Sequence, residues 1–442
     1  MFPTKPIVLA LLLLAIGGLA RAQVTLPQVQ VPNLPGLPTE PLNRTVNGVL
    51  DQADPQRLRE LRQVRVRNLL RTNRTVLEAD PRGAPIIRNE VIALSPTQAA
   101  LDRARAAGFG IGRTRTLDGL DVSIVVLQAP PGMSTRRALE RLRREDPEGT
   151  YDYNHVYLES GAVGTVGLAA GAAEALDAAS GGTPAVATKV GLIDGGVQRS
   201  HAVFNGVVVH EHGCTGGSIP SAHGTAVASL LVGQGDVFHG AAPGAELFAA
   251  DVYCGLATGG ALDSVAEAFA WMSREKVPVI NISLVGPANA LLEQIVRVVT
   301  TRGHIVVAAV GNDGPSAPPL FPAAYPDVVA VTGVDAKDRV LVEACRGKHV
   351  DFSAPGASMS AAGIEAPFGV VRGTSFAAPI VAGLLARQLT TINKTQADAA
   401  IAALVSQATD LGARGVDKIY GNGLVGENLR PPEKLASSQR AR

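Results

Sequence analysis

The sequence after residue 187 alternates short apolar runs with longer helix-like stretches, and this alternation constrains the fold more than any other feature. The apolar runs predict strands over residues 188–193, 246–252, 277–284, 305–310 and 328–334. The other stretches predict helices over residues 223–232, 262–276, 289–301 and 395–407, and one that begins at or near Ser375. Apolar strands that alternate with helices imply a parallel sheet covered on both faces. We therefore expect an α/β fold with a doubly wound, mostly parallel sheet over residues 187–425.

A second, smaller pattern occupies residues 85–160. Strand-like runs at 90–94, 122–127 and 151–157 alternate with helix-like stretches at 97–107 and 134–144. This order predicts a small α+β sandwich of the split βαβ, ferredoxin-like kind. Nothing in it looks catalytic, and Gly108, Gly110 and Gly112 do not form the G-x-G-x-x-G loop that binds a nucleotide.

The remaining segments are terminal or connecting pieces. Residues 1–22 combine Lys5, an apolar core and an Ala20-Arg21-Ala22 cleavage site, as a secretory signal peptide does. A retained membrane anchor is the alternative. The other predicted segments are a Pro-rich linker with a basic helix (23–84), a Gly- and Ala-rich linker (161–186) and a flexible tail (426–442). We expect an exported protein, periplasmic or extracellular, that is not stably inserted in a membrane once the signal is removed.

The charge balance gives no support for a nucleic-acid partner, because the formal net charge is only +1. One local stretch is strongly basic. It begins at Asp54-Pro55, a capping residue followed by proline at the first helical position, and places arginines among leucines up to Arg74. Such a helix either covers another domain and exposes a solvated outer face, or lies on anionic lipid, and the sequence leaves both readings open.

Three cysteines in an oxidising compartment allow one disulfide and one thiol. We favour the pair Cys214–Cys254, because both flank the same predicted sheet edge; three unbridged cysteines remain the alternative. His210, His212 and Cys214 stand at alternate positions and would share one side of a strand, as metal ligands can. Because no fourth ligand follows at a suitable spacing, we expect no metal and no cofactor.

Three residues suited to nucleophilic catalysis occupy the ends of predicted elements. Asp194 closes the first apolar strand, and His223 and Ser375 each open a helix. In an open α/β sheet, function gathers at the carboxyl ends of the strands. Serine is a poor nucleophile until a neutral imidazole takes its proton, and the imidazole needs a carboxylate to fix its tautomer. Taken alone, Ser375 would only be a helix cap.

Asn312 is a fourth candidate. It ends the predicted strand 305–310, between Gly311 and Asp313-Gly314. A side-chain amide placed there could donate a hydrogen bond to a developing oxyanion, and loss of such a donor costs about 3–4 kcal/mol of transition-state stabilisation. Alone, Asn-Asp-Gly would be a plain turn.

These segments together resemble the active-site signatures of the subtilisin-like serine proteases, the subtilase family. The matching signatures are Asp194-Gly195-Gly196, His223-Gly224-Thr225 and Gly373-Thr374-Ser375, and Asn312 matches the oxyanion asparagine of the family. The segment 281–286 resembles the strand that lines the family's substrate cleft. There the resemblance implies that Ser283, Leu284 and Gly286 pair with substrate backbone. One departure is Gly195, where the family usually has Ser or Thr.

The resemblance covers residues 186–425 and implies a secreted serine endopeptidase that acts on proteins or peptides. It also implies that residues 85–160 are a propeptide, which helps the protease fold and then inhibits it within the same molecule. We therefore expect self-cleavage between Leu158 and Thr188. The alternatives are a catalytically silent scaffold protein and a narrow-specificity processing protease of the cell envelope.

Overall fold

A computed structural model describes residues 55–160, 162–164, 188–215, 217–364, 367–432 and 435. The predicted signal peptide, the Pro-rich part of the linker 23–84, most of the linker 161–186 and the end of the tail 426–442 lie outside the described residues. All described residues belong to one compact unit. None of the helices described is both long and apolar enough to cross a membrane.

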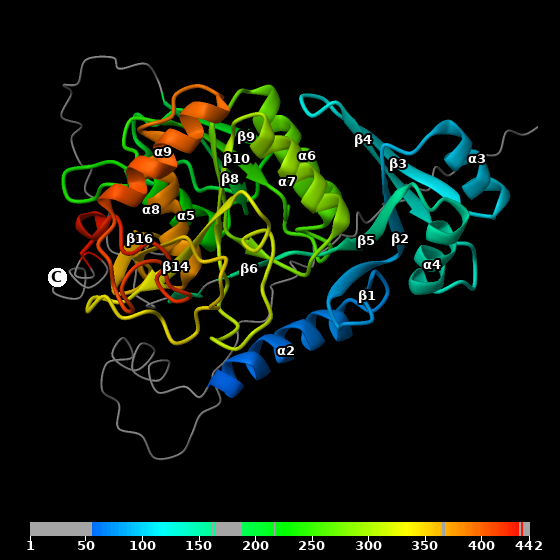
Figure 1. Ribbon diagram of the computed structural model, residues 1–442, viewed down its shortest axis with the longest axis horizontal. Helices are drawn as coiled ribbons and strands as arrows, with labels where there is room; N and C mark the ends of the chain where they lie inside the picture. The colour runs from blue at the N-terminus through cyan, green and yellow to red at the C-terminus, as the bar shows by residue number, and fades with distance from the viewer. Residues whose placement is uncertain are drawn as a thin grey trace, which may run out of the picture. The chain divides into compact units, whose positions relative to one another are not determined.

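A seven-stranded sheet forms the centre of the larger part of the chain (Figure 1). Every neighbouring pair in it is parallel, in the order β15-β14-β13-β11-β8-β10-β9. The strands are β8 (Lys189–Asp194), β9 (Val209–His212), β10 (Glu246–Asp251), β11 (Val279–Ile282), β13 (Ile305–Ala309), β14 (Val328–Val334) and β15 (Phe352–Pro355). Its central strands are buried on both faces, which explains their continuous apolar runs.

Helices cover both faces of this sheet. Helices α5 (Ala222–Val232) and α8 (Thr374–Ala386) pack into one apolar core, and α6 (Leu262–Arg274) and α7 (Ala290–Thr301) pack into the other. Helix α9 (Lys394–Gln407) lies against α8. The predicted doubly wound α/β fold is therefore confirmed.

The chain before it forms the N-terminal sandwich, residues 77–155. Its strands are β1 (Leu77–Ala79), β2 (Pro85–Leu94), β3 (Gly110–Leu117), β4 (Val122–Gln128) and β5 (Thr150–His155). They pair antiparallel in the order β1-β2-β4-β3, with β5 also on β2. Apart from β1, this is the ferredoxin-like order that the sequence predicts.

The two faces of this small sheet have different partners. Helices α3 (Gln98–Ala106) and α4 (Thr135–Glu145) cover one face, where Val91 is buried. The other face, which includes Ile92, shares a core with α6 and α7 of the larger part. Adjacent residues of β2 are thus buried on opposite sides, so this strand joins the sandwich to the large domain.

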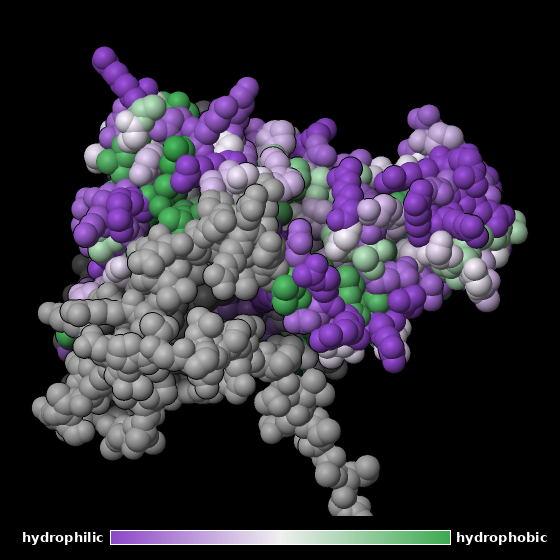
Figure 2. Space-filling view, turned by 90° about the horizontal axis from the view of Figure 1, so that it is seen from below, coloured by the Kyte–Doolittle hydropathy of each residue, from purple (hydrophilic) through white to green (hydrophobic). Residues whose placement is uncertain are grey.

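Several short elements surround the site. They are α2 (Pro55–Thr72), β6 (Leu158–Glu159), β7 (Ala162–Gly164), β12 (Leu284–Val285), β16 (Met359–Ala362), β17 (Phe368–Arg372) and the 3₁₀ turns 202–204 and 427–429. The run 277–284, predicted as one strand, is divided at Ser283: β11 stays in the main sheet, and β12 pairs with β6. Figure 2, seen from below relative to Figure 1, shows mostly hydrophilic residues over the described part of that face.

The disulfide joins Cys214 and Cys254, with Cα atoms 5.5 Å apart, as the sequence favoured. Cys345 is buried and takes no part in it. Because Cys214 is consumed, its thiolate does not join the two histidines considered as metal ligands. His210 Nε2 lies 3.2 Å from Glu246 Oε2, and the ring of His212 stacks on the ring of Trp271.

Candidate active site

Asp194, His223 and Ser375 meet at the carboxyl edge of the large sheet. Asp194 is the last residue of β8, His223 is the second residue of α5 and Ser375 is the second residue of α8. All three side chains are buried. The parallel strand order brings together residues that are far apart in the sequence.

Asp194 and His223 form a tight pair. His223 Nδ1 lies 2.9 and 3.0 Å from the two Asp194 oxygens, so the proton on Nδ1 is held and Nε2 is left as the basic nitrogen. Burial lowers the pKa of His223, but the charge of Asp194, their hydrogen bond and the charge of Glu159 together raise it above the ordinary value of 6.5. The pair therefore favours the imidazolium that forms when a serine proton is taken.

The presence of glycine at position 195 is explained by the residues packed against it. A Cβ atom there would lie 2.3 Å from the hydroxyl oxygen of Ser221, the residue that caps helix α5 by accepting from Gly224 N. The chain thus brings the start of α5 against the end of β8, which only glycine permits. The backbone N–H of Gly195 donates to Asp194 at 2.7 Å, so the aspartate is fixed without the hydroxyl that the family usually places here.

The hydroxyl of Ser375 bonds to groups other than His223. It lies 2.9 Å from the Ser160 hydroxyl and donates to the Ser283 carbonyl at 3.3 Å. Within the part of the chain that the structure describes, no hydrogen-bond partner reaches the buried His223 Nε2. The Asp–His contact of a triad is therefore made here, and the His–Ser contact is not.

Pro379 helps to hold this segment. It is the sixth residue of α8, so it does not lie in the first turn of the helix. Because proline has no N–H, the carbonyl of Ser375 has no partner one turn along the helix. Ser283 fills this gap by donating its hydroxyl to that carbonyl at 3.1 Å.

Asn312 lies on the loop after β13 and faces the same point. Its Oδ1 accepts the backbone N–H of Thr374 at 3.1 Å, which leaves Nδ2 directed into the site, 3.5 Å from the Ser160 hydroxyl. The hydroxyl of Thr374 in turn accepts Gly311 N–H at 3.2 Å. The loop that carries Asn312 and the segment that carries Ser375 thus hold each other.

Strand β12 receives a piece of the chain's own N-terminal part. Leu284 pairs with Glu159 and Val285 with Leu158 in an antiparallel ladder, and Ser160 N–H points to the Ser283 carbonyl at 3.4 Å. Sequence reasoning did not single out Glu159 and Ser160. Their position just after the last strand of the sandwich is the signal that could have found them.

Gly286 plays a different part from β12. It pairs with Phe321 through two backbone hydrogen bonds of 3.0 Å. A Cβ at Gly286 would lie 2.5 Å from the ring of Tyr157, so glycine here makes room for that aromatic side chain. The Tyr157 hydroxyl donates to the Pro287 carbonyl at 3.1 Å.

Comparison with known proteins fits this geometry. The family model described as "Subtilase family" matches residues 186–423. Subtilisin BL of Lederbergia lenta is 35% identical over 207 residues, which cover 46% of this chain and 75% of that protein. Subtilisin E of Bacillus subtilis (strain 168) is 29% identical over 310 residues, which cover 65% and 77%.

Two solved structures share the fold. Fervidolysin from Fervidobacterium pennivorans, a keratinolytic enzyme, aligns with a TM-score of 0.62 and 18% identity over 78% of this chain and 61% of its own. An epidermin leader peptide processing serine protease from Staphylococcus aureus aligns with a TM-score of 0.56 and 16% identity over 79% and 98%. The chain belongs to the subtilase family and is a subtilisin-like serine endopeptidase.

Proposed function

We propose that Ser375 is the nucleophile of this endopeptidase, His223 its general base and Asp194 the residue that orients His223. Ser375 Oγ attacks the scissile carbonyl while His223 Nε2 takes its proton, and His223 then gives that proton to the leaving amine. Water repeats the cycle to release the acyl group. The observation that carries this proposal is the buried Asp194–His223 pair beside Ser375, at the sheet edge where Asn312 also points.

Asn312 and the Ser375 N–H would stabilise the oxyanion. The amide Nδ2 of Asn312 is directed into the site because Thr374 holds its oxygen. Ser375 N–H lies in the first turn of α8, where backbone donors have no partner inside the helix. The two donors come from elements that are bonded to each other, so their spacing is fixed before substrate binds.

Substrate would bind as an extra strand along Ser283 and Leu284. Residues 158–160 already lie there as an antiparallel strand. Gly286 was expected to pair with substrate backbone as well, but its backbone groups bond to Phe321, so its proposed role is to leave room for a side chain where Tyr157 now lies. In β-strand addition, main-chain hydrogen bonds give affinity and the side-chain pockets give specificity.

We propose that residues 85–160 are an intramolecular inhibitor and that the enzyme is made as a zymogen. Residues 158–160 lie along β12, and beyond Ser160 strand β7 pairs with β17, which leads into the segment of Ser375. The chain therefore crosses the site as a substrate would. We place the self-cleavage after Ser160, within the interval expected from the sequence.

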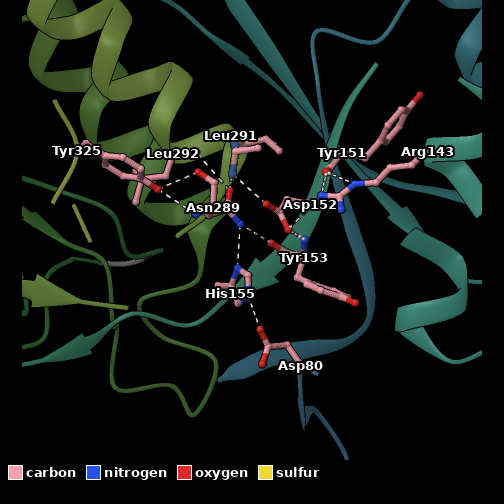
Figure 3. Close-up of polar contacts among 11 residues, drawn as sticks. Asp80, Arg143, Tyr151, Asp152, Tyr153, His155, Asn289, Leu291, Leu292 and Tyr325 are labelled. Atoms are coloured by element: carbon pink, nitrogen blue, oxygen red, sulfur yellow. Dashed lines mark hydrogen bonds and ion pairs between the residues drawn. The ribbon is translucent and has the colours of Figure 1, made fainter. Parts of the chain in front are cut away.

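Polar contacts support a templating role for the sandwich (Figure 3). Asp152 accepts the Ala290 N–H at the start of α7 at 2.9 Å, and so satisfies a helix donor of the large domain. Asn289, the capping residue of α7, donates its side-chain amide to the Tyr153 carbonyl and contacts His155 Nδ1. His155 contacts Asp80 at 3.3 Å, so the network reaches back to the start of the sandwich.

A second contact of the same kind lies at α6. Arg113 of β3 bonds to Asp263 of α6 and to Glu90 of β2, and Asn154 contacts both carboxylates. The sandwich thus meets the first turns of α6 and α7 with satisfied polar groups, as a folding template would. The alignment with subtilisin E also covers more of this chain than the family match does.

We propose that the protein is exported to the periplasm or the cell exterior. The signal-like residues 1–22 and the Cys214–Cys254 disulfide support this location, because disulfides persist in oxidising compartments.

A serine-directed fluorophosphonate tests the catalytic assignment. We expect it to label the chain once, on the peptide that contains Ser375, and to fail with His223→Ala although that variant is folded by circular dichroism. Labelling on another serine, or equal labelling of the His223 variant, would refute the assignment.

A further inference from the structure

A short segment after β14, residues 343–345, forms backbone hydrogen bonds with the loop of Asn312 at two points. The Glu343 carbonyl accepts Gly314 N–H at 2.8 Å, and Cys345 N–H donates to the Gly311 carbonyl at 2.9 Å. These two bonds lie on either side of Asn312. The segment therefore fixes both ends of the turn that aims the proposed oxyanion donor.

The side chain of Glu343 reaches the other half of the site. Its carboxylate accepts Arg372 Nε at 2.8 Å and Arg372 Nη2 at 3.0 Å, a bidentate pair. The side chains are 7% and 5% exposed. Arg372 ends β17, and the next residues are Gly373, Thr374 and Ser375.

We propose that Glu343 and Arg372 are positioning residues for the proteolytic reaction. Together they hold the loop of Asn312 at a set distance from the segment of Ser375. A bidentate guanidinium–carboxylate pair has a fixed relative orientation. Because breaking one partner leaves a buried charge without compensation, the pair resists small displacements.

The effect would be exerted in the transition state. The oxyanion donor must lie within about 2.7–3.1 Å of the developing charge, and a displacement of about 1 Å can cost a hundredfold in rate. Thr374 already links the two segments by its own hydrogen bonds to Asn312 and Gly311. The ion pair adds a second link on the opposite side of Gly373.

A merely stabilising role makes a different prediction, so the test measures kcat, KM and the melting temperature. The variants of the full chain are Glu343→Gln and Arg372→Lys, with active sites counted by phosphonate labelling. The control is Arg339→Lys, because Arg339 also contacts a carboxylate, that of Asp335, through two nitrogens, but in an exposed ion pair within its own loop. We expect kcat per labelled site to fall roughly 10- to 100-fold with KM within about twofold, and the control to leave both unchanged.

A double-mutant cycle with Asn312→Ala decides between the two roles. If Glu343 acts through Asn312, then Glu343→Gln costs less than about threefold in kcat once Asn312 is alanine. An equal loss in both backgrounds would overturn the inference, as would a loss confined to the number of labelled sites. Should Glu343→Gln not fold, Arg372→Lys keeps the charge and runs the same cycle. The inference rests on the proposed role of Asn312: if Asn312→Ala alone leaves kcat unchanged, that role fails and the inference with it, whereas an additive cycle overturns only the inference.

A separate observation concerns helix α2, the basic helix of the sequence. Arg62 makes a two-nitrogen contact with Asp313, the neighbour of Asn312, at 3.0 and 3.2 Å. One turn on, Arg65 donates to the Glu159 carbonyl at 3.3 Å. Val66, on the same face, is buried. This face of α2 therefore contacts both the loop of Asn312 and the segment 158–160, which lies along β12.

We infer that α2 is a second inhibitory element, which slows release of the chain before Gly161 after cleavage. This rests on the proposed zymogen and deepens it. The contacts join arginines to a carboxylate and a carbonyl at a partly exposed rim, so salt weakens the charged contact. The inference favours the covering role over the lipid-binding role for this helix.

The test compares Arg62→Ala/Arg65→Ala with a control pair on exposed positions, Arg67→Ala/Arg71→Ala. Mass spectrometry follows the cut after Ser160, and peptide hydrolysis follows the appearance of activity. We expect the first pair to shorten the delay between cut and activity severalfold and to abolish its dependence on NaCl, while the control behaves as wild type. An unchanged delay would overturn the inference. If mass spectrometry finds no cut in any variant, the zymogen proposal is wrong. In that case, equal rates of phosphonate labelling in wild type and in Arg62→Ala/Arg65→Ala would overturn the inhibitory role of α2 as well.

Discussion

The two halves of the active site are held by different parts of the chain. The proposed acid–base half, Asp194 and His223, already makes the Asp–His contact that the proposed mechanism needs, and its direct contacts come from the large domain. The nucleophile half, Ser375 and Asn312, is in contact with Ser160 of the N-terminal part. In this chain the proposed base is therefore preorganised, whereas the proposed nucleophile contacts a segment that would leave after the proposed self-cleavage.

Removing the base should have the largest effect. His223→Ala is expected to lower kcat by a factor on the order of 10⁶, since no other described residue at the site takes the serine proton. Peptide hydrolysis per folded molecule measures this. The variant should melt close to wild type; a loss of less than about tenfold would show that another group acts as base.

Removing the oxyanion amide should cost less. Asn312→Ala is expected to lower kcat by about 10²–10³ with little change in KM, because the amide contacts charge that exists only in the transition state. Steady-state kinetics on one peptide substrate provide the measurement. A rise in KM at constant kcat would instead place Asn312 in ground-state binding.

Removing the contact between Ser160 and Ser375 should raise the rate of self-cleavage by a modest factor, whereas the two changes above lower a rate. Ser160→Ala removes the 2.9 Å contact with Ser375, so the serine can turn to His223. A hydrogen bond of about 1 kcal/mol corresponds to roughly fivefold faster self-cleavage. Time-resolved mass spectrometry of the full chain follows this rate. Slower cleavage would mean that Ser160 assists the reaction.

The smallest effect concerns pH. The charge of Glu159 helps to raise the pKa of His223, and His223 must be neutral to act as base. Glu159→Gln should therefore lower that pKa and move the acid limb of the self-cleavage rate to lower pH. If the proposed processing removes Glu159 from the site, the acid limb of peptide hydrolysis by the processed enzyme should be the same with or without this change. A shift to higher pH would contradict the assignment of the charge effect.

The sequence predicted the parts of the site that depend on local pattern. Asp194 ends a strand, His223 and Ser375 lie at the start of helices and Asn312 follows a strand, and the alternation of elements identified the sheet that brings them together. It did not reveal the function of Gly195, because the cause is Ser221, which lies 26 residues later and meets Gly195 only in the folded chain. The Glu343–Arg372 pair was missed for the same reason.

The missed strands have a simpler cause. Strand β3 carries glycines and exposed arginines, so its residues show neither the alternation nor the apolar run of a buried strand. Strands β16 and β17 are short, and residues 363–367 between them contain Gly363 and Pro367. Their positions follow from partners elsewhere in the fold: β17 pairs with β7 from the far side of the cleft.

The claim that Ser375 cleaves this chain is tested by the mass of the purified chain from Gln23 onward, as wild type and as Ser375→Ala. We expect wild type to yield a fragment that begins at Gly161, and the variant to stay whole. If the variant were cut at the same bond, or if wild type stayed whole and took up no phosphonate, the claim that Ser375 cleaves the chain's own N-terminal part would be wrong.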